Sequence, residues 1–243
     1  MPVTPVDYTA VSDNVSNIRH RILSAGGNKI QLIAVTKGFG VDAIAAASLA
    51  NCDGIGENYA QELLFKYDKN GAFAGEKVER LPVHFVGQLQ SNKVVGLLGV
   101  VDFWQTIDRQ SVIRELSKSK SKSNSNSKQV QAQQVFVQVN STGELSKGGC
   151  TLHGAEDLCA TATEAGLEVV GLMTIGPTNG SIRECEKAFT QVRRLADRLG
   201  LAQCSMGMSD DYECAIGCGS TMVRVGSGIF GARPTLGPTV EIA

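Results

Sequence analysis

Residues 31–37 read Gln-Leu-Ile-Ala-Val-Thr-Lys, a short apolar run that is rich in strand-forming residues and ends on a lysine. Residues 41–50, Val-Asp-Ala-Ile-Ala-Ala-Ala-Ser-Leu-Ala, follow closely and have a helical pattern. A strand that leads directly into a helix is the repeating unit of α/β proteins with a parallel sheet. The number of such units along the chain therefore decides the fold.

Short strand-like runs alternate with helical patterns along the rest of the chain. We expect eight strands, at 31–37, 53–57, 83–87, 102–107, 135–140, 169–175, 203–208 and 221–226. Helices are expected near 41–50, 58–67, 91–99, 109–118, 153–165, 182–199 and 210–217, with a short helical turn after 228. An amphipathic helix over 8–23 precedes the first strand, since apolar residues recur there at helical spacing.

Eight strand–helix units predict the α/β class and a single (β/α)8 TIM barrel with an extra N-terminal helix. The 243 residues suit one such barrel, so we expect one domain over 1–243. A doubly wound open sheet is the competing architecture, because periodicity does not reveal whether a sheet closes. Residues 117–134 are rich in Lys, Ser, Asn and Gln and lack a core-facing pattern. We expect them to form a disordered surface insertion between the fourth helix and the fifth strand.

The net charge of −1 and the pI of about 6.3 indicate neither nucleic-acid nor membrane binding. No apolar run approaches the roughly 18 residues of a membrane span, and the N-terminus lacks targeting features, so we expect a cytoplasmic protein. The seven cysteines show no C-x-x-C pair and no zinc-like histidine spacing, so no metal site is predicted. A metal or redox role for Cys214 and Cys218, four residues apart on an expected helix, is the alternative.

Lys37 is the first candidate site residue. Alternate residues of a barrel strand point inward, so Ile33, Val35 and Lys37 share one face and Lys37 reaches the C-terminal rim. Active sites of this fold gather at that rim. The competing interpretation is an ordinary rim lysine whose ammonium group extends into water.

The loops after the seventh and eighth strands supply the next candidates, because phosphate sites of this fold use those loops. Ser209 follows the seventh expected strand, and Gly226 and Ser227 follow the eighth. An aldehyde cofactor that carries a phosphate would engage Lys37 at one end and these residues at the other. Alternatively, Ser209 is the N-cap of the helix that begins at Asp210.

Arg224 shares one face of the eighth expected strand with Met222, so an inward Met222 also places the guanidinium inside the barrel. A buried guanidinium needs an acceptor, and a pyridine nitrogen would serve. The alternative is a buried ion pair with a carboxylate such as Glu57.

Several longer blocks of sequence are more specific than any single residue. They are Ala34-Val35-Thr36-Lys37, Gly56-Glu57-Asn58-Tyr59-Ala60-Gln61-Glu62-Leu63, His84-Phe85-Val86-Gly87-Gln88-Leu89-Gln90-Ser91-Asn92-Lys93, Gly171-Leu172-Met173-Thr174-Ile175, Ser205-Met206-Gly207-Met208-Ser209 and Val223-Arg224-Val225-Gly226. Across nearly the whole chain they resemble the pyridoxal phosphate homeostasis proteins, single-domain relatives of the alanine racemase N-terminal barrel.

The resemblance implies a fold type III barrel that binds pyridoxal 5'-phosphate (PLP). By resemblance, Lys37 is the Schiff-base lysine and Arg224 faces the pyridine nitrogen. Ser209, Gly226 and Ser227 hold the phosphate, and Asn58 lies near the cofactor ring. The implied function is intracellular PLP homeostasis, by buffering the cofactor or delivering it to PLP-dependent apo-enzymes. We expect a monomer or a weak homodimer.

Two observations favour a binding protein over an amino-acid racemase. Fold type III racemases resemble this barrel plus a C-terminal β domain, whose tyrosine supplies a second base, and this chain ends soon after the eighth expected strand. An arginine at the pyridine nitrogen also disfavours the protonated ring that most PLP chemistry needs. We therefore assign no catalytic residue. A racemase or other fold type III enzyme is the alternative, and a sugar-phosphate isomerase or aldolase with its own Schiff base on Lys37 is a third hypothesis.

Overall fold

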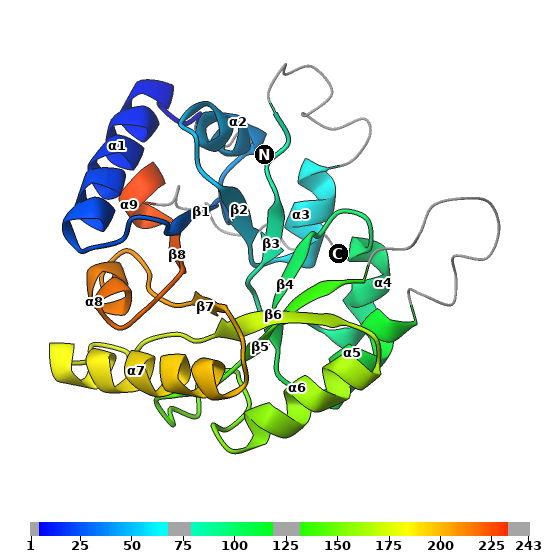
Figure 1. Ribbon diagram of the computed structural model, residues 1–243. Helices are drawn as coiled ribbons and strands as arrows, with labels where there is room; N and C mark the ends of the chain where they lie inside the picture. The colour runs from blue at the N-terminus through cyan, green and yellow to red at the C-terminus, as the bar shows by residue number, and fades with distance from the viewer. Residues whose placement is uncertain (1–4, 68–78, 119–131, 233–243) are drawn as a thin grey trace.

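The computed structural model describes residues 5–67, 79–118 and 132–232. Eight parallel strands close into a barrel in the order β1 to β8, with helices around the outside (Figure 1). The strands are β1 (Gln31–Val35), β2 (Gly54–Glu57), β3 (Val83–Phe85), β4 (Phe103–Ile107), β5 (Gln134–Gln138), β6 (Glu168–Met173), β7 (Gln203–Ser205) and β8 (Met222–Val225). Each overlaps an expected strand, so the predicted (β/α)8 barrel is confirmed and the open sheet is wrong.

The helices also follow the expected order. They are α1 (Tyr8–Ser24), α2 (Val41–Leu49), α3 (Ala60–Lys66), α4 (Val94–Leu97), α5 (Gln110–Ser117), α6 (Gly154–Glu164), α7 (Ile182–Arg198), α8 (Tyr212–Gly217) and α9 (Ser227–Phe230). The helix expected over 91–99 is instead a 3₁₀ turn at Ser91–Lys93 followed by the four residues of α4. The chain leaves the helix before Gly99, whose φ of +83° is incompatible with helical backbone. Within the described ranges no helix is long and apolar enough to cross a bilayer.

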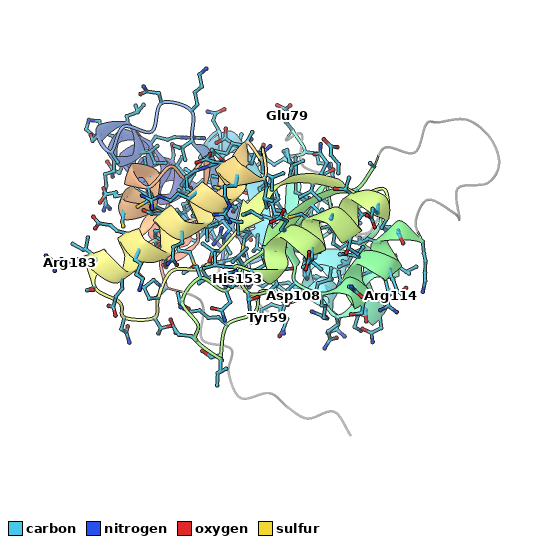
Figure 2. All side chains as sticks on the ribbon, turned by 60° about the horizontal axis from the view of Figure 1, so that its bottom comes forward. Tyr59, Glu79, Asp108, Arg114, His153 and Arg183 are labelled. Carbon is cyan, nitrogen blue, oxygen red and sulfur yellow. The ribbon has the colours of Figure 1, made fainter. Side chains whose placement is uncertain are left out.

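Residues of the strands alternate between the barrel interior and the helical layer, as their sequence predicts. Ile33, Phe136, Met173 and Met222 form a small cluster inside the barrel. Leu32 belongs to the larger cluster between strands and helices. Charged side chains such as Arg114 on α5 and Arg183 on α7 lie on the outer surface (Figure 2).

The N-terminal helix α1 covers the side of the barrel where the first and last strands meet. It packs against α2, α8 and α9, and Figure 1 shows it beside α9. The Asn14 side-chain amide donates to the carbonyl of Ile229 at 2.9 Å, which ties α1 to α9. The apolar stripe that predicted this helix, Val11, Val15, Ile18 and Ile22, is buried. The helix therefore completes the core over the β1–β8 seam.

The segment predicted to be disordered, 117–134, begins and ends within regular structure. Ser117 is the last residue of α5 and Gln134 is the first of β5, so the predicted boundaries are wrong at both ends. Gln133 is held as well, because its side-chain oxygen accepts a hydrogen bond from the Trp104 indole at 3.0 Å. Residues 119–131 lie outside the described residues, and for them disorder stays a prediction.

Candidate functional site

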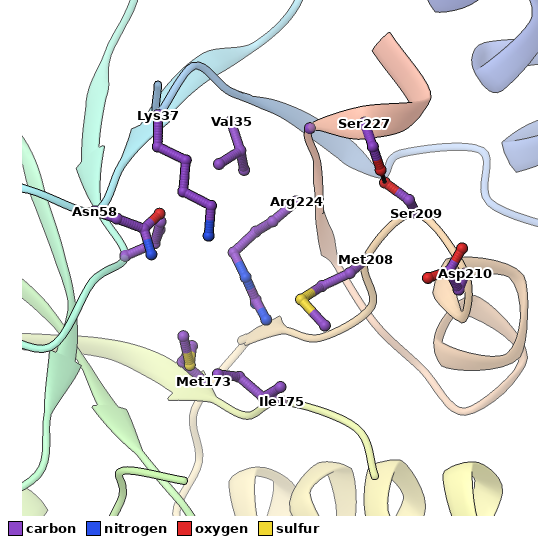
Figure 3. A pocket seen from close by; sticks show the side chains of 12 residues that line it. Val35, Lys37, Asn58, Met173, Ile175, Met208, Ser209, Asp210, Arg224 and Ser227 are labelled. Carbon is purple, nitrogen blue, oxygen red and sulfur yellow. Dashed lines mark hydrogen bonds between the residues drawn. The ribbon is translucent and has the colours of Figure 1, made fainter. Parts of the chain in front are cut away.

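A cavity of about 240 Å³ opens at the C-terminal end of the barrel. Its walls include all six residues that the sequence singled out: Lys37, Asn58, Ser209, Arg224, Gly226 and Ser227 (Figure 3). Apolar side chains complete the lining, among them Val35, Val86 and Met173. A second hollow of about 350 Å³ adjoins the first, and Lys37 and Ser227 line both. Closure of the barrel thus brings together residues from opposite ends of the chain.

Lys37 lies just beyond the end of β1, and its half-buried side chain extends into the cavity (Figure 3). A buried network behind β1 fixes the peptide that precedes it. The carbonyl of Thr36 accepts a hydrogen bond from Lys66 Nζ at 2.8 Å, and the Thr36 hydroxyl donates to Glu57 at 2.5 Å. Lys66 and Glu57 form an ion pair at 2.6 Å, with side chains 2% and 0% exposed. The backbone that carries the candidate lysine is therefore anchored by buried charge.

Glu62 anchors the peptide on the other side of Lys37. Its carboxylate accepts a hydrogen bond from the backbone N–H of Gly38 at 2.7 Å and pairs with Lys66 Nζ at 2.7 Å. Sequence reasoning missed Lys66 and Glu62. Their spacing of four residues on an expected helix indicates an ion pair. It does not reveal that both side chains contact the backbone on either side of Lys37.

The alternative that Glu57 forms an ion pair with Arg224 is wrong, because Glu57 pairs with Lys66. Glu57 points away from the barrel interior, toward Lys66, and strand alternation could have shown this, because Gly56 beside it faces inward. Burial raises the pKa of the Glu57 carboxyl, and the charge of Lys66 opposes that shift.

Arg224 is 4% exposed and lies at the base of the cavity (Figure 3). Its two terminal nitrogens donate to neutral acceptors, Nη1 to the Ser205 hydroxyl at 2.6 Å and Nη2 to the Thr174 carbonyl at 2.8 Å. Burial lowers the pKa of the guanidinium to about 10, and the charge of Asp211 opposes that shift. Ser205 and Thr174 lie in blocks that carry the family resemblance, but no pattern in the sequence indicates that they contact Arg224.

Two serines, Ser209 after β7 and Ser227 at the start of α9, meet on the other side of the cavity. The hydroxyls of Ser209 and Ser227 lie 3.1 Å apart, and the N–H of Gly228 donates to Ser209 Oγ at 3.3 Å. Ser209 is not the N-cap of the next helix, since α8 begins at Tyr212 and is preceded by Asp211 at the cap position. That alternative is therefore wrong, and the hydroxyl of Ser209 faces the start of α9.

The tight turn after β7 depends on Gly207. Its φ is +95°, and a Cβ there would lie 2.7 Å from the Cα of Tyr212. A larger residue would therefore separate α8 from the barrel and move Ser209, which lies two residues later.

Asn58 completes the set on the wall beside Lys37. The oxygen of its side-chain amide is buried and accepts no hydrogen bond from the described part of the chain. An acceptor buried without a donor costs about 1–3 kcal/mol, which favours a polar ligand atom or water next to it. The cavity thus combines an amine, a guanidinium, two hydroxyls and the side chain of Asn58.

The cysteines are free thiols. Burial raises the pKa of Cys52, Cys159 and Cys214 to about 12 and that of Cys150 and Cys204 to about 11. Cys218 lies just beyond the end of α8 and not on it, which corrects the expected helical pair with Cys214. Among the described residues no three metal-ligating side chains are grouped, so the proposed metal role for this pair finds no ligand set.

Comparison with known proteins agrees with the motifs. The model of the alanine racemase N-terminal domain matches residues 6–234. The pyridoxal phosphate homeostasis protein of Schizosaccharomyces pombe is 37% identical over 229 residues, which cover 89% of this chain and 90% of that protein. Its counterpart in Pseudomonas aeruginosa is 34% identical over 239 residues, which cover 93% of this chain and 96% of that protein. The chain belongs to the pyridoxal phosphate homeostasis protein family. The family resemblance found in the sequence is thereby confirmed.

Several solved structures share the fold. An unknown protein from Bifidobacterium adolescentis superposes with a TM-score of 0.80 at 30% identity, over 92% of this chain and 95% of that one. PipY of Synechococcus elongatus, solved without PLP, superposes with a TM-score of 0.78 at 25% identity, over 91% of this chain and 100% of that one. The alanine racemase of Corynebacterium glutamicum gives 0.65 at 17% identity and is covered over only 66% of its length, so it shares the barrel fold alone.

The buried ion pair behind Lys37 generates a stability prediction. Lys66→Met leaves the Glu57 carboxylate buried without its partner, and we expect the free energy of unfolding at pH 7 to fall by roughly 3–5 kcal/mol. The loss of stability should shrink as the pH falls, because the variant can then fold with Glu57 protonated and neutral. Chemical denaturation at several pH values measures both effects.

Lys118→Met is the matched control. Lys118 also pairs with a glutamate at 2.6 Å, but at the exposed C-terminal end of α5, where a pair contributes less than about 1 kcal/mol. Equal losses for the two variants would contradict the anchoring role of Lys66.

Proposed function

We propose that this protein binds PLP in the cavity at the C-terminal rim and serves intracellular PLP homeostasis, by buffering the cofactor or delivering it to apo-enzymes. The observation that carries the proposal is that the six residues chosen from the sequence line one cavity with complementary chemistry. The curated relatives are named for the same function.

In this proposal Lys37 holds the aldehyde end of the cofactor. Its Nζ would hold the aldehyde through a C=N bond, formed with release of water and reversed by hydrolysis or by another amine. The anchored peptides on both sides of Lys37 support this role, because they restrict the positions that the amine can reach. The bond stores cofactor without consuming it.

Arg224 and Asn58 would face the ring. A guanidinium donates hydrogen bonds and accepts none, so a pyridine nitrogen beside Arg224 must be the unprotonated acceptor. This arrangement weakens the ring as an electron sink. Asn58 lines the same cavity as Arg224, which supports its place beside the ring.

Neutral donors would hold the phosphate. The hydroxyls of Ser209 and Ser227 now bond to each other, and each can rotate to donate to a phosphate oxygen. Backbone N–H groups at Gly226 and Ser227 are the further donors that we propose. Glycine at 226 suits this loop, because a Cβ there would lie only 3.3 Å from the carbonyl oxygen of Val35.

We further propose that the protein does not use its cofactor for catalysis. Proton exchange on both faces of an amino acid needs two positioned groups. Tyr59 is 57% exposed at the surface (Figure 2) and Tyr212 is 2% exposed, and the described lining of the cavity includes neither. Asp210 does line the cavity, but it is exposed and lies at the opposite edge from Lys37 (Figure 3).

The covalent role of Lys37 is tested by borohydride reduction of the protein with PLP bound. Peptide mass mapping should find the pyridoxyl group on Lys37, and Lys37→Ala should lose both the label and the visible absorption band. Lys147→Ala is the matched control, since Lys147 is a rim lysine paired with Glu144 at 2.7 Å. Labelling confined to other lysines, with binding unchanged in Lys37→Ala, would refute the assignment.

The phosphate site is tested by comparing PLP with pyridoxal, which lacks the phosphate. We expect PLP to bind far more tightly, and Ser209→Ala to weaken PLP by roughly tenfold while leaving pyridoxal unchanged. Ser141→Ala removes a rim hydroxyl that bonds to Thr174 at 2.9 Å and should alter neither affinity. Similar affinities of the wild-type protein for the two compounds would refute the proposed phosphate site.

The absence of catalysis is tested by incubating the PLP-bound protein with L-alanine or L-serine in deuterated water. We expect no sustained exchange of the α-proton and no D-isomer, as measured by NMR and chiral chromatography. Turnover that Lys37→Ala abolishes would establish the racemase alternative instead.

A further inference from the structure

Arg224 is the first member of a hydrogen-bond chain that crosses the barrel interior. Its Nη1 donates to Ser205 Oγ at 2.6 Å, and Ser205 Oγ donates to the side-chain oxygen of Gln105 at 2.7 Å. The side-chain nitrogen of Gln105 lies 2.8 Å from Nδ1 of His84. All four side chains are buried. These hydrogen bonds thus link the base of the cavity to β3, through Ser205 on β7 and Gln105 on β4.

The direction of every bond in this chain follows from its first member. A guanidinium can only donate, so Ser205 accepts from Arg224 and has one proton left for the oxygen of Gln105. That bond turns the amide nitrogen of Gln105 toward His84, whose Nδ1 must then accept. The Gln105 nitrogen also lies 3.0 Å from the sulfur of Met222, a weak acceptor, which agrees with this orientation.

His84 has to remain a neutral acceptor for the chain to persist. Burial and the charge of Arg224 lower the pKa of its imidazole to about 3, so the ring is neutral at physiological pH. The ring stacks on Phe103 with centroids 4.5 Å apart. It has space inside the barrel because residue 54 is glycine, where a Cβ would lie 3.0 Å from the imidazole. The imidazole of His84 is therefore a neutral acceptor, and Phe103 and Gly54 allow its position inside the barrel.

We propose that Ser205, Gln105 and His84 are positioning residues, which aim the guanidinium of Arg224 at the ring nitrogen of the bound cofactor. The inference rests on the proposed function. Arg224 has neutral acceptors on both terminal nitrogens, so its orientation depends on these bonds and not on a carboxylate. A chain in which every bond runs the same way is also strengthened by mutual polarisation.

The test compares PLP with its analogue in which a C–H replaces the pyridine nitrogen. The wild-type protein should prefer PLP, because the analogue offers no acceptor to Arg224. Ser205→Ala and Gln105→Leu should each weaken PLP by roughly tenfold and leave the analogue unchanged, so that the preference largely disappears. Binding is measured by absorption titration, and circular dichroism confirms that each variant is folded.

Ser220→Ala is the matched control. Ser220 is a buried barrel serine that donates to backbone carbonyls, among them Met206 at 2.8 Å, and belongs to a different set of bonds. It should retain the full preference for PLP. Arg224→Leu serves as the reference and should abolish the preference.

The outcomes separate the two proposals. If the wild-type protein binds no PLP, or binds both compounds equally, the proposed function or the role of Arg224 fails. If Arg224→Leu abolishes the preference while folded Ser205→Ala and Gln105→Leu retain it, the positioning chain alone is refuted. Equal weakening of PLP and the analogue in these variants also refutes it, because a general structural defect would have that effect.

Discussion

The pairing of β1 with β8 is the constraint on which the cavity depends. Its register places Ile33 opposite Arg224, so the loops that follow these strands leave the barrel side by side. In an open sheet with the same strand order, β1 and β8 would lie at opposite edges, and Lys37 could not share a cavity with Ser227. Closure is stabilised from outside by α1, which buries its apolar stripe over this seam.

The barrel buries positive charge in two different ways. Outside the strands, Lys66 is compensated by the carboxylates of Glu57 and Glu62, and the result is a rigid support for the loop at Lys37. Inside the barrel, Arg224 has only neutral acceptors on its terminal nitrogens, the Ser205 hydroxyl and a backbone carbonyl. A carboxylate in contact there would neutralise the guanidinium, whereas neutral acceptors orient it and leave its charge available to the cavity.

The fold could be predicted from the sequence because period-two strands and amphipathic helices are local signals. The six candidate residues could be grouped because Lys37 and Gly226 end expected strands and Ser209 directly follows one, and the family motifs supplied Asn58. The network around Lys66 was not predicted, because the spacing of Glu62 and Lys66 does not show that both face the backbone around Lys37. The hydrogen bonds through Gln105 were not predicted, because they join side chains from elements far apart in sequence. For the same reason Gln134 was not assigned to β5: its pairing with Phe103 and Glu168 outweighs the polar composition of the segment.

The high pKa of the buried cysteines bears on chemical selectivity. An aldehyde reacts with thiolates as well as with amines, and the thiolate is the reactive form of cysteine. A thiol with a pKa of about 12 is deprotonated at pH 7 in roughly one molecule in 10⁵. Burial keeps Cys52 and Cys159 in this unreactive form, and none of the described cysteines lines the cavity. For an aldehyde ligand, these two buried thiols therefore compete little with the lysine at the cavity.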